Sequence, residues 1–85
     1  MKKVLFVCIA NYCRSPVAQK IMSNIDTINI YDSCGLHPLE VSNMDSRSKK
    51  FLENNGIEDI IHIPKQISRE LIEENDLIVA MDFII

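Results

Sequence analysis

The sequence predicts an α/β protein with three layers, α/β/α, around a small parallel sheet, in the element order β-α-β-α-α-β. Two continuous apolar runs, residues 4–8 and 77–81, are typical of strands that are buried on both faces, as in a parallel sheet. Helical patterns lie between the predicted strands, and this alternation predicts right-handed crossovers. A length of 85 residues allows one domain at most, so we expect residues 1–85 to form a single domain.

The first predicted strand, residues 4–8, leads through a polar loop into a helix. Ser15 followed by Pro16 is a strong helix-start signal, with Ser15 as the N-cap and the proline at the first helical position. Residues 28–31 are predicted as a second short strand, and residues 34–43 as a loop. Five apolar residues of the helix recur at helical spacing: Val17, Ala18, Ile21, Met22 and Ile25.

A second helix is predicted after the loop. Asp45 is its expected N-cap, Phe51 and Leu52 are expected to face inward, and Gly56 is expected to stop it. Residues 57–63 are predicted to add a short extended piece.

The last third of the chain is predicted to hold a third helix and a third strand. Ser68 is the expected cap of that helix, and residues 77–81 are expected to form a buried strand. The sequence stops just past this strand at three apolar residues, 83–85, and we therefore expect an interrupted domain.

Composition argues against several classes of function. The net charge of -3 gives no support to a nucleic-acid partner. Three cysteines are an odd number, unlike the disulfide framework of a small secreted protein, so we expect a reducing, cytoplasmic location. No apolar stretch approaches the roughly 20 residues that span a bilayer, so we expect no membrane partner. Since the sequence has no metal-ligand cluster and no glycine-rich nucleotide loop, we expect neither a metal nor a cofactor.

The stretch from Cys8 to Pro16 joins the end of a strand to the start of a helix. In an open α/β sheet, ligands bind outside the carboxyl ends of the strands, where a loop can turn its N–H groups into an anion-binding concavity. The N-terminus of the following helix adds positive potential. Arg14 offers a planar fork for two phosphate oxygens, and the combined field favours a thiolate at Cys8.

These residues have a second interpretation that the pattern alone leaves open. Cys8 continues an apolar strand and is then a buried packing residue, although the preceding strand, the following helix start and Asn11 together favour the functional interpretation. Arg14 is then an ordinary surface residue, and Ser15 with Pro16 only starts a helix. On the functional interpretation, the Ser15 hydroxyl also donates a hydrogen bond to the Cys8 sulfur.

At residues 7–16, VCIANYCRSP, the sequence resembles the low-molecular-weight protein-tyrosine phosphatase family. The resemblance continues at residues 32–35, 45–48, 55–57, 62–68 and 76–82. It implies that Cys8 is the nucleophile that becomes a phosphocysteine and that Arg14 binds the phosphoryl oxygens. It also implies a phosphate-binding loop made of Ile9, Ala10, Asn11, Tyr12, Cys13, Arg14 and Ser15.

The resemblance further implies residues that hold this loop in its strained shape by hydrogen bonds, namely Asn11, Ser15, Ser33 and His62. Asparagine suits the task because it tolerates left-handed backbone angles. Cys13 is the second thiol of the loop; it either pairs with Cys8 under oxidation or only packs. Cys34 and His37 have no implied role, and we expect the first to pack and the second to be solvated.

The sequence departs from the family pattern in two respects. The general acid of the family is an aspartate far beyond the third strand, so the chain is expected to be truncated before the fourth strand and to lack that acid. Asp82 matches the aspartate that closes the third strand instead. The loop at residues 36–41 has no aromatic residue to stack on a phosphotyrosine ring. We therefore expect impaired hydrolysis, since general acid catalysis contributes about 10²–10⁴-fold.

The implied partners are a phosphotyrosine protein or a small aryl phosphate, with inorganic phosphate as an inhibitor. Two alternatives stay open. One is a non-catalytic remnant that binds oxyanions without turnover. The other is chemistry like that of arsenate reductase, which is less favoured because it needs further downstream cysteines and only Cys13 and Cys34 remain.

Overall fold

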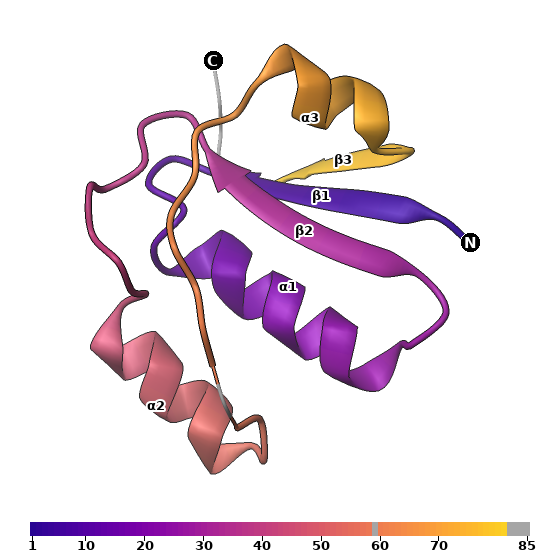
Figure 1. The fold of residues 1–85 in the computed structure, drawn as a ribbon. Helices are drawn as coiled ribbons and strands as arrows, with labels where there is room; N and C mark the ends of the chain where they lie inside the picture. The colour runs from indigo at the N-terminus through magenta and orange to yellow at the C-terminus, as the bar shows by residue number, and fades with distance from the viewer. Residues whose placement is uncertain (59, 82–85) are drawn as a thin grey trace.

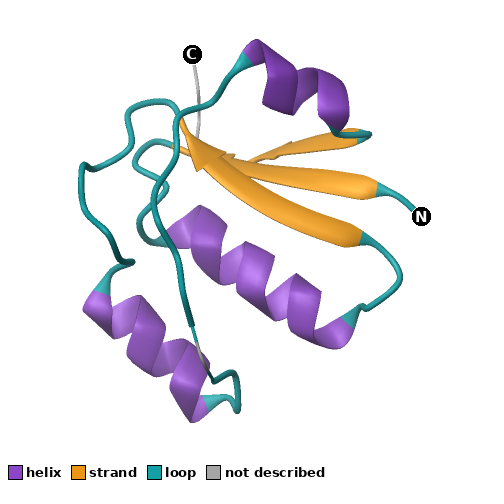
Figure 2. Cartoon of the chain, in the orientation of Figure 1, coloured by secondary structure: helices purple, strands orange, loops and turns teal. Residues whose placement is uncertain are grey.

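The computed structural model describes residues 1–58 and 60–81. Their helices and strands follow the predicted order, which confirms the α/β class (Figures 1 and 2). The elements are β1 (Lys3–Cys8), α1 (Arg14–Ile25), β2 (Ile30–Gly35), α2 (Ser46–Asn54), α3 (Arg69–Glu74) and β3 (Leu77–Ala80).

The three strands form one parallel sheet in the order β2-β1-β3. In Figure 1, α3 covers one face of this sheet, and α1 lies against the other face with α2 beside it. Because β1 is the central strand, its carboxyl end lies between the carboxyl ends of β2 and β3. Cys8, the last residue of β1, is paired in register with Gly35, the last residue of β2.

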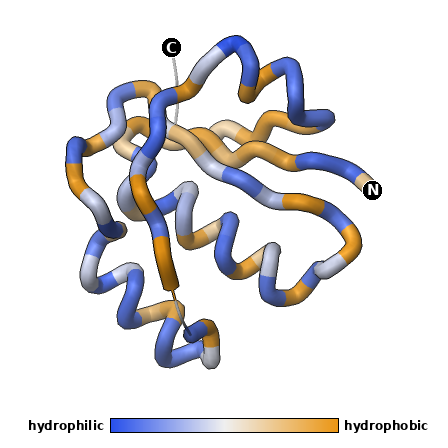
Figure 3. Tube along the Cα trace, in the orientation of Figure 1, coloured by the Kyte–Doolittle hydropathy of each residue, from blue (hydrophilic) through white to orange (hydrophobic). Residues whose placement is uncertain are grey.

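The core is built around β1, which is apolar from Val4 onward (Figure 3). Leu5 and Val7 point to one face and pack with Cys34, Leu36, Ile67 and Leu71. The burial of residues 4–8 confirms the prediction of a strand covered on both faces. Cys8, at the carboxyl end of this strand, is itself buried.

The first helix starts differently from the prediction. Its N-cap residue is Cys13, which makes no side-chain capping hydrogen bond, and Ser15 lies inside the first turn. The prediction of Ser15 as N-cap is therefore wrong; its hydroxyl bonds to Cys8 and Asn11 instead. Ile25, predicted on the apolar face, is 68% exposed at the last residue of the helix.

The second strand also differs, since it runs from Ile30 to Gly35 rather than over residues 28–31. Its central residues are polar, which hid the strand from a search for apolar runs. Parallel pairing with β1 over the whole length of both strands sets its real extent. Residues 34 and 35, predicted as loop, therefore belong to the sheet.

The second helix confirms Asp45 as its cap, because the Asp45 carboxylate accepts from the Ser48 N–H, and Leu52 is fully buried. Phe51 is 52% exposed, so its inward placement is wrong. The helix ends before Gly56, whose φ of 81° is the left-handed geometry that favours glycine there.

The last third of the chain confirms Ser68 as a cap and corrects the predicted burial of the third strand. The Ser68 hydroxyl accepts a hydrogen bond from the Leu71 N–H. The described residues 57–58 and 60–63, predicted as a short extended piece, pair with no strand; the isolated bridge between this segment and β2 joins Gln66 to Gly35. β3 lies at the sheet edge and is largely exposed rather than buried. The predictions for Asp82 and residues 83–85 fall outside the described residues.

None of the helices among the described residues is both long enough and apolar enough to cross a bilayer.

Candidate active site

The loop between β1 and α1 is anchored through its carbonyl groups. Six successive carbonyls, those of residues 8–13, each accept a hydrogen bond from a group outside the loop. The first three donors are Leu36 N to the Cys8 oxygen at 3.1 Å, His37 N to the Ile9 oxygen at 2.8 Å and Leu39 N to the Ala10 oxygen at 3.2 Å. The other three are His62 Nε2 to the Asn11 oxygen at 2.8 Å, Asp45 N to the Tyr12 oxygen at 2.9 Å and Val17 N to the Cys13 oxygen at 3.3 Å.

This anchoring decides where the N–H groups point. In a planar trans peptide, the C=O of one residue and the N–H of the next point to opposite sides, and the described residues contain no cis peptide bond. Carbonyls that face outward therefore turn the N–H groups of residues 9–14 toward the inside of the loop. The Asn11 N–H follows this rule and donates to Cys8 Sγ at 3.2 Å. Successive inward N–H groups are the arrangement that binds anions.

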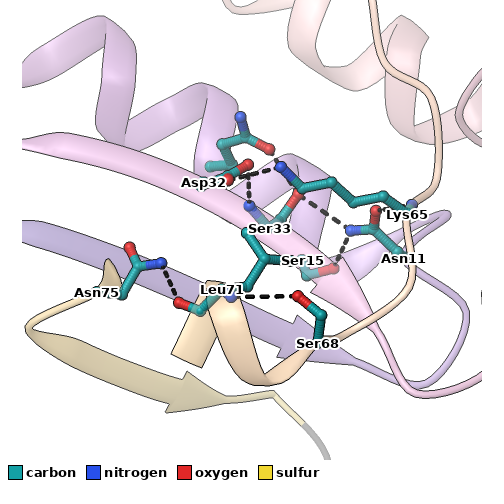
Figure 4. A network of polar contacts seen from close by, with 9 residues as sticks. Asn11, Ser15, Asp32, Ser33, Lys65, Ser68, Leu71 and Asn75 are labelled. Carbon is teal, nitrogen blue, oxygen red and sulfur yellow. Dashed lines mark hydrogen bonds and ion pairs between the residues drawn. The ribbon is translucent and has the colours of Figure 1, made fainter. Parts of the chain in front are cut away.

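Asn11 is the residue on which the loop turns. Its φ of 50° is left-handed, as expected for an asparagine at a tight turn, and it is fully buried. Its amide Nδ2 donates to Ser15 Oγ at 2.9 Å and to Ser33 Oγ at 3.0 Å. Its Oδ1 accepts from the Lys65 N–H at 2.9 Å. Figure 4 shows this side chain between β2, α1 and the segment before α3.

The direction of each proton in this network can be worked out. Both Nδ2 protons of Asn11 are used, so Ser15 Oγ and Ser33 Oγ each accept one. The Ser33 hydroxyl donates its own proton to Gln19 Oε1 at 2.5 Å. Cys8 Sγ, at 2.8 Å, is then the partner for the proton of Ser15. The sulfur therefore lies within reach of two donors, the Ser15 hydroxyl and the Asn11 N–H.

His62 holds the far side of the loop. Burial lowers its pKa below 6.5, and the nearby Lys20 and Lys65 lower it further, whereas its hydrogen bond to Asn11 acts in the opposite direction. The ring is accordingly neutral at neutral pH. Since a carbonyl oxygen can only accept, His62 Nε2 must carry the proton and donate to the Asn11 oxygen.

Gly35 is a functional residue that the sequence analysis missed. A Cβ at this position would lie 2.7 Å from Ile9 O and 2.8 Å from Asn11 N, both backbone atoms of the loop. Only glycine lets β2 approach so closely. The sequence does carry a signal for this role, namely the glycine two residues after Ser33, because a glycine in a strand often marks a site where another part of the backbone approaches closely.

The remaining predicted site residues lie on the open side. Arg14 is exposed and borders an open pocket of about 680 Å³ between α1 and α2, whose lining also includes Cys13, Asp45, Arg47 and Phe51. Tyr12 is half-buried and Ile9 is 46% exposed. The structure thus brings Cys8, Asn11, Ser15, Ser33 and His62 into one network of contacts.

Two other expectations can be compared with the structure. His37 is exposed, as expected. Cys34 is fully buried in the core, and burial raises the pKa of its thiol to about 11. Within the described residues, no group of three or more His, Cys, Asp or Glu side chains lies so as to hold a metal ion.

Comparison with known proteins identifies the family. A sequence model described as low molecular weight phosphotyrosine protein phosphatase matches residues 3–84, nearly the whole chain. The chain belongs to the low molecular weight phosphotyrosine protein phosphatase family. The matched residues include the loop after β1 with its Cys-x5-Arg spacing.

Individual members of this phosphatase family support the assignment. The chain is 38% identical over 88 residues to the phosphotyrosine protein phosphatase of Rattus norvegicus, and 35% identical over 81 residues to the protein-tyrosine-phosphatase Ptp of Acinetobacter johnsonii. Among solved structures, the YwlE arginine phosphatase of Geobacillus stearothermophilus superimposes with a TM-score of 0.87 at 32% identity, over 95% of this chain and 53% of that one.

The match covers the two proteins unequally. It takes in 95% of this chain but 55% of the rat phosphatase, and 94% of this chain but 56% of the Acinetobacter enzyme. The chain thus spans a little over half the length of the curated relatives it matches. Family membership therefore rests on residues 3–84, whereas the activity of the whole-length relatives is a separate question for this chain.

Proposed function

We propose that this chain cleaves phosphomonoesters by transferring the phosphoryl group to Cys8. The observation that carries the proposal is the outward anchoring of six successive carbonyls, which aims the loop N–H groups at the space above the Cys8 sulfur. A nucleophile at the base of an anion cradle is placed to attack phosphorus, and the same donors stabilise the charge that develops during transfer.

Each step has an assigned group. The Cys8 thiolate forms the P–S bond while the bond from phosphorus to the leaving oxygen breaks. Water then forms a new P–O bond, and the P–S bond breaks to return the thiolate and inorganic phosphate. The N–H groups of Ile9, Ala10, Asn11, Tyr12, Cys13, Arg14 and Ser15, with the Arg14 guanidinium, cradle the phosphoryl oxygens. The Ser15 hydroxyl, 2.8 Å from the sulfur, stabilises Cys8 both as nucleophile and as leaving group.

The loop keeps its shape through buried neighbours. Ser33 and His62 bind opposite ends of Asn11, one at the side-chain amide and the other at the backbone oxygen. These contacts hold a left-handed residue that would otherwise relax, so we assign Asn11, Ser33 and His62 as positioning residues.

The substrate class we propose is a phosphotyrosine protein or a small aryl phosphate, with inorganic phosphate as a competitive inhibitor. The likeness to an arginine phosphatase makes phosphoarginine a second substrate to assay. The resemblance places the general acid outside residues 1–85, so in an assay of residues 1–85 alone the leaving group would depart without that acid. We therefore expect activated aryl phosphates to be cleaved about 10²–10⁴-fold faster than phosphotyrosine. A reducing, cytoplasmic location suits a reactive thiolate.

The test is release of p-nitrophenol from p-nitrophenyl phosphate in the presence of a chelator. Cys8→Ser is expected to abolish release, whereas Cys34→Ala, which alters a buried cysteine of the core, is expected to keep it. Inorganic phosphate should compete with the substrate. Equal rates for Cys8→Ser and the parent chain would end the proposal.

A second candidate is oxyanion binding without turnover. The observation in its favour is that the match covers little more than half of the length of each relative. It predicts a calorimetric signal with phosphate or vanadate and no released p-nitrophenol. Arsenate reduction is not proposed. It would need a further reactive thiol, and Cys34 is buried with a pKa of about 11.

A further inference from the structure

The second thiol of the loop is tied to the start of α2 rather than to the nucleophile. Cys13 is exposed at the rim of the open pocket, and its Sγ lies 3.0 Å from Ser48 Oγ. Ser48 Oγ lies in turn 3.1 Å from Asp45 Oδ2, which also accepts the Ser48 N–H at 3.0 Å. Three side chains therefore form a chain of contacts that ends on a carboxylate.

The carboxylate fixes the direction of both protons. The hydrogen bond from the Ser48 backbone is the largest influence that lowers the pKa of Asp45, so this group is ionised at neutral pH and can only accept. The Ser48 hydroxyl must donate its proton to Asp45. Cys13 must then be the donor to Ser48 Oγ, which means that its sulfur is held as S–H.

The same segment also fixes the backbone next to Cys13. The Asp45 N–H donates to the Tyr12 carbonyl at 2.9 Å. Cys8 has a separate set of partners, the Ser15 hydroxyl and the Asn11 N–H. The two sulfurs of one short loop are thus held by different elements.

We propose that Ser48, with Asp45 behind it, is a positioning residue that restrains Cys13 and slows its reaction with an oxidised Cys8. The inference rests on the proposed function in one respect, namely that Cys8 is the reactive thiolate. Its new content is that the first turn of α2 sets how fast the loop forms an internal disulfide.

The chemistry involves hydrogen peroxide as the oxidant. Peroxide converts the Cys8 thiolate to a sulfenic acid, and its other oxygen leaves as hydroxide. Cys13 must then leave Ser48 and give up its proton to attack the Cys8 sulfur. An S–S bond forms, the S–O bond breaks, and the hydroxyl departs as water with that proton. A second peroxide molecule competes for the sulfenic acid and gives the irreversible sulfinic acid.

The test compares Ser48→Ala with the parent chain and with Ser46→Ala, which removes an exposed hydroxyl from the same turn outside these contacts. Each chain is treated with hydrogen peroxide, and mass spectrometry measures the ratio of Cys8–Cys13 disulfide to Cys8 sulfinic acid. Releasing one hydrogen bond should raise this ratio about two- to tenfold in Ser48→Ala. Ser46→Ala should match the parent, and Cys13→Ser should give no disulfide.

The rate of the first oxidation at Cys8 separates restraint from general loosening. It should be unchanged in Ser48→Ala, because the contacts of Cys8 are untouched, and the melting temperature should stay near that of the parent. A ratio in Ser48→Ala equal to or below that of the parent overturns the inference. A raised ratio in a chain that releases no p-nitrophenol supports the inference while the proposed hydrolysis fails, so the two outcomes are distinguishable.

Discussion

Replacing Gly35 by alanine tests whether the shape of the loop depends on close approach of β2. The new Cβ would lie 2.7 Å from Ile9 O, 2.8 Å from Asn11 N and 3.0 Å from Ala10 C. Ordinary contact begins near 3.4 Å, so these backbone atoms must retreat by about 0.4–0.7 Å. β2 cannot yield instead, because Gly35 is hydrogen-bonded on its other edge to Lys65 O at 2.9 Å and to Ile67 N at 2.8 Å.

The displacement has different consequences for stability and for activity. Overpacking of this kind costs about 1–3 kcal/mol of unfolding free energy, which lowers the melting temperature by about 4–8 °C per kcal/mol. Misplacing catalytic groups by about 1 Å costs about 10²-fold in rate. Since Gly35 touches the anion cradle itself, we expect Gly35→Ala to lower kcat/KM for p-nitrophenyl phosphate by about tenfold to a hundredfold.

Gly56→Ala is the matched control. Its φ of 81° makes alanine strained there, yet no atom of residues 1–58 or 60–81 lies within 4 Å of the new Cβ. It should lose about 1–2 kcal/mol of stability and keep the activity of the parent. Thermal unfolding, kcat/KM and the calorimetric affinity for phosphate are measured on all three chains. The reasoning is refuted if Gly35→Ala keeps both the kcat/KM and the phosphate affinity of the parent.

Two further predictions concern the residues that hold the loop. Asn11→Ala removes three side-chain hydrogen bonds and leaves alanine at a φ of 50°, so urea unfolding should show that the free energy of unfolding falls by about 3 kcal/mol or more. Asn11→Gly should lose less, because glycine tolerates this backbone angle. Equal losses in the two variants would contradict the role of the backbone angle. Folding lowers the pKa of His62 below its usual 6.5. At pH values between the folded pKa and 6.5, the unfolded chain therefore binds more protons than the folded chain. The unfolding free energy should therefore fall as the pH drops below 6.5 and stay level above it, and His62→Gln should remove this slope in urea titrations across that range. A slope that persists in His62→Gln would assign the effect to another group.

The local signals in the sequence were sufficient for the order of the elements and for most of their ends. Asp45 and Ser68 cap the helices that they were predicted to cap, because capping depends on a side chain and an N–H two or three residues away. Residues 4–8 are buried as predicted, since a β-branched apolar run needs no distant partner to be recognised.

The predictions for β2 and β3 that proved wrong depend on how the whole sheet is arranged. β2 was placed too early because its polar residues 32 and 33 pair with β1, some 27 positions away, and serve the loop rather than the core. For Ser15 the predicted contact with the Cys8 sulfur is found at 2.8 Å, and only the capping role is wrong, because the helix already begins at Arg14 with Cys13 as its N-cap. The exposure of β3 is likewise a property of its place at the sheet edge, which its apolar residues do not reveal.

The anchors of the loop explain why binding and turnover should separate in this chain. The six donors to the loop carbonyls come from residues 17–62, and the partner of the Asn11 side-chain oxygen is Lys65. Those segments all lie in the part of the family that the chain matches, so the cradle has its hydrogen-bonding supports within residues 1–81. Protonation of the leaving group depends on a different residue, which the family resemblance places beyond the third strand. The affinity for phosphate should therefore depend on the loop, whereas the rate of hydrolysis should depend on the acidity of the leaving group.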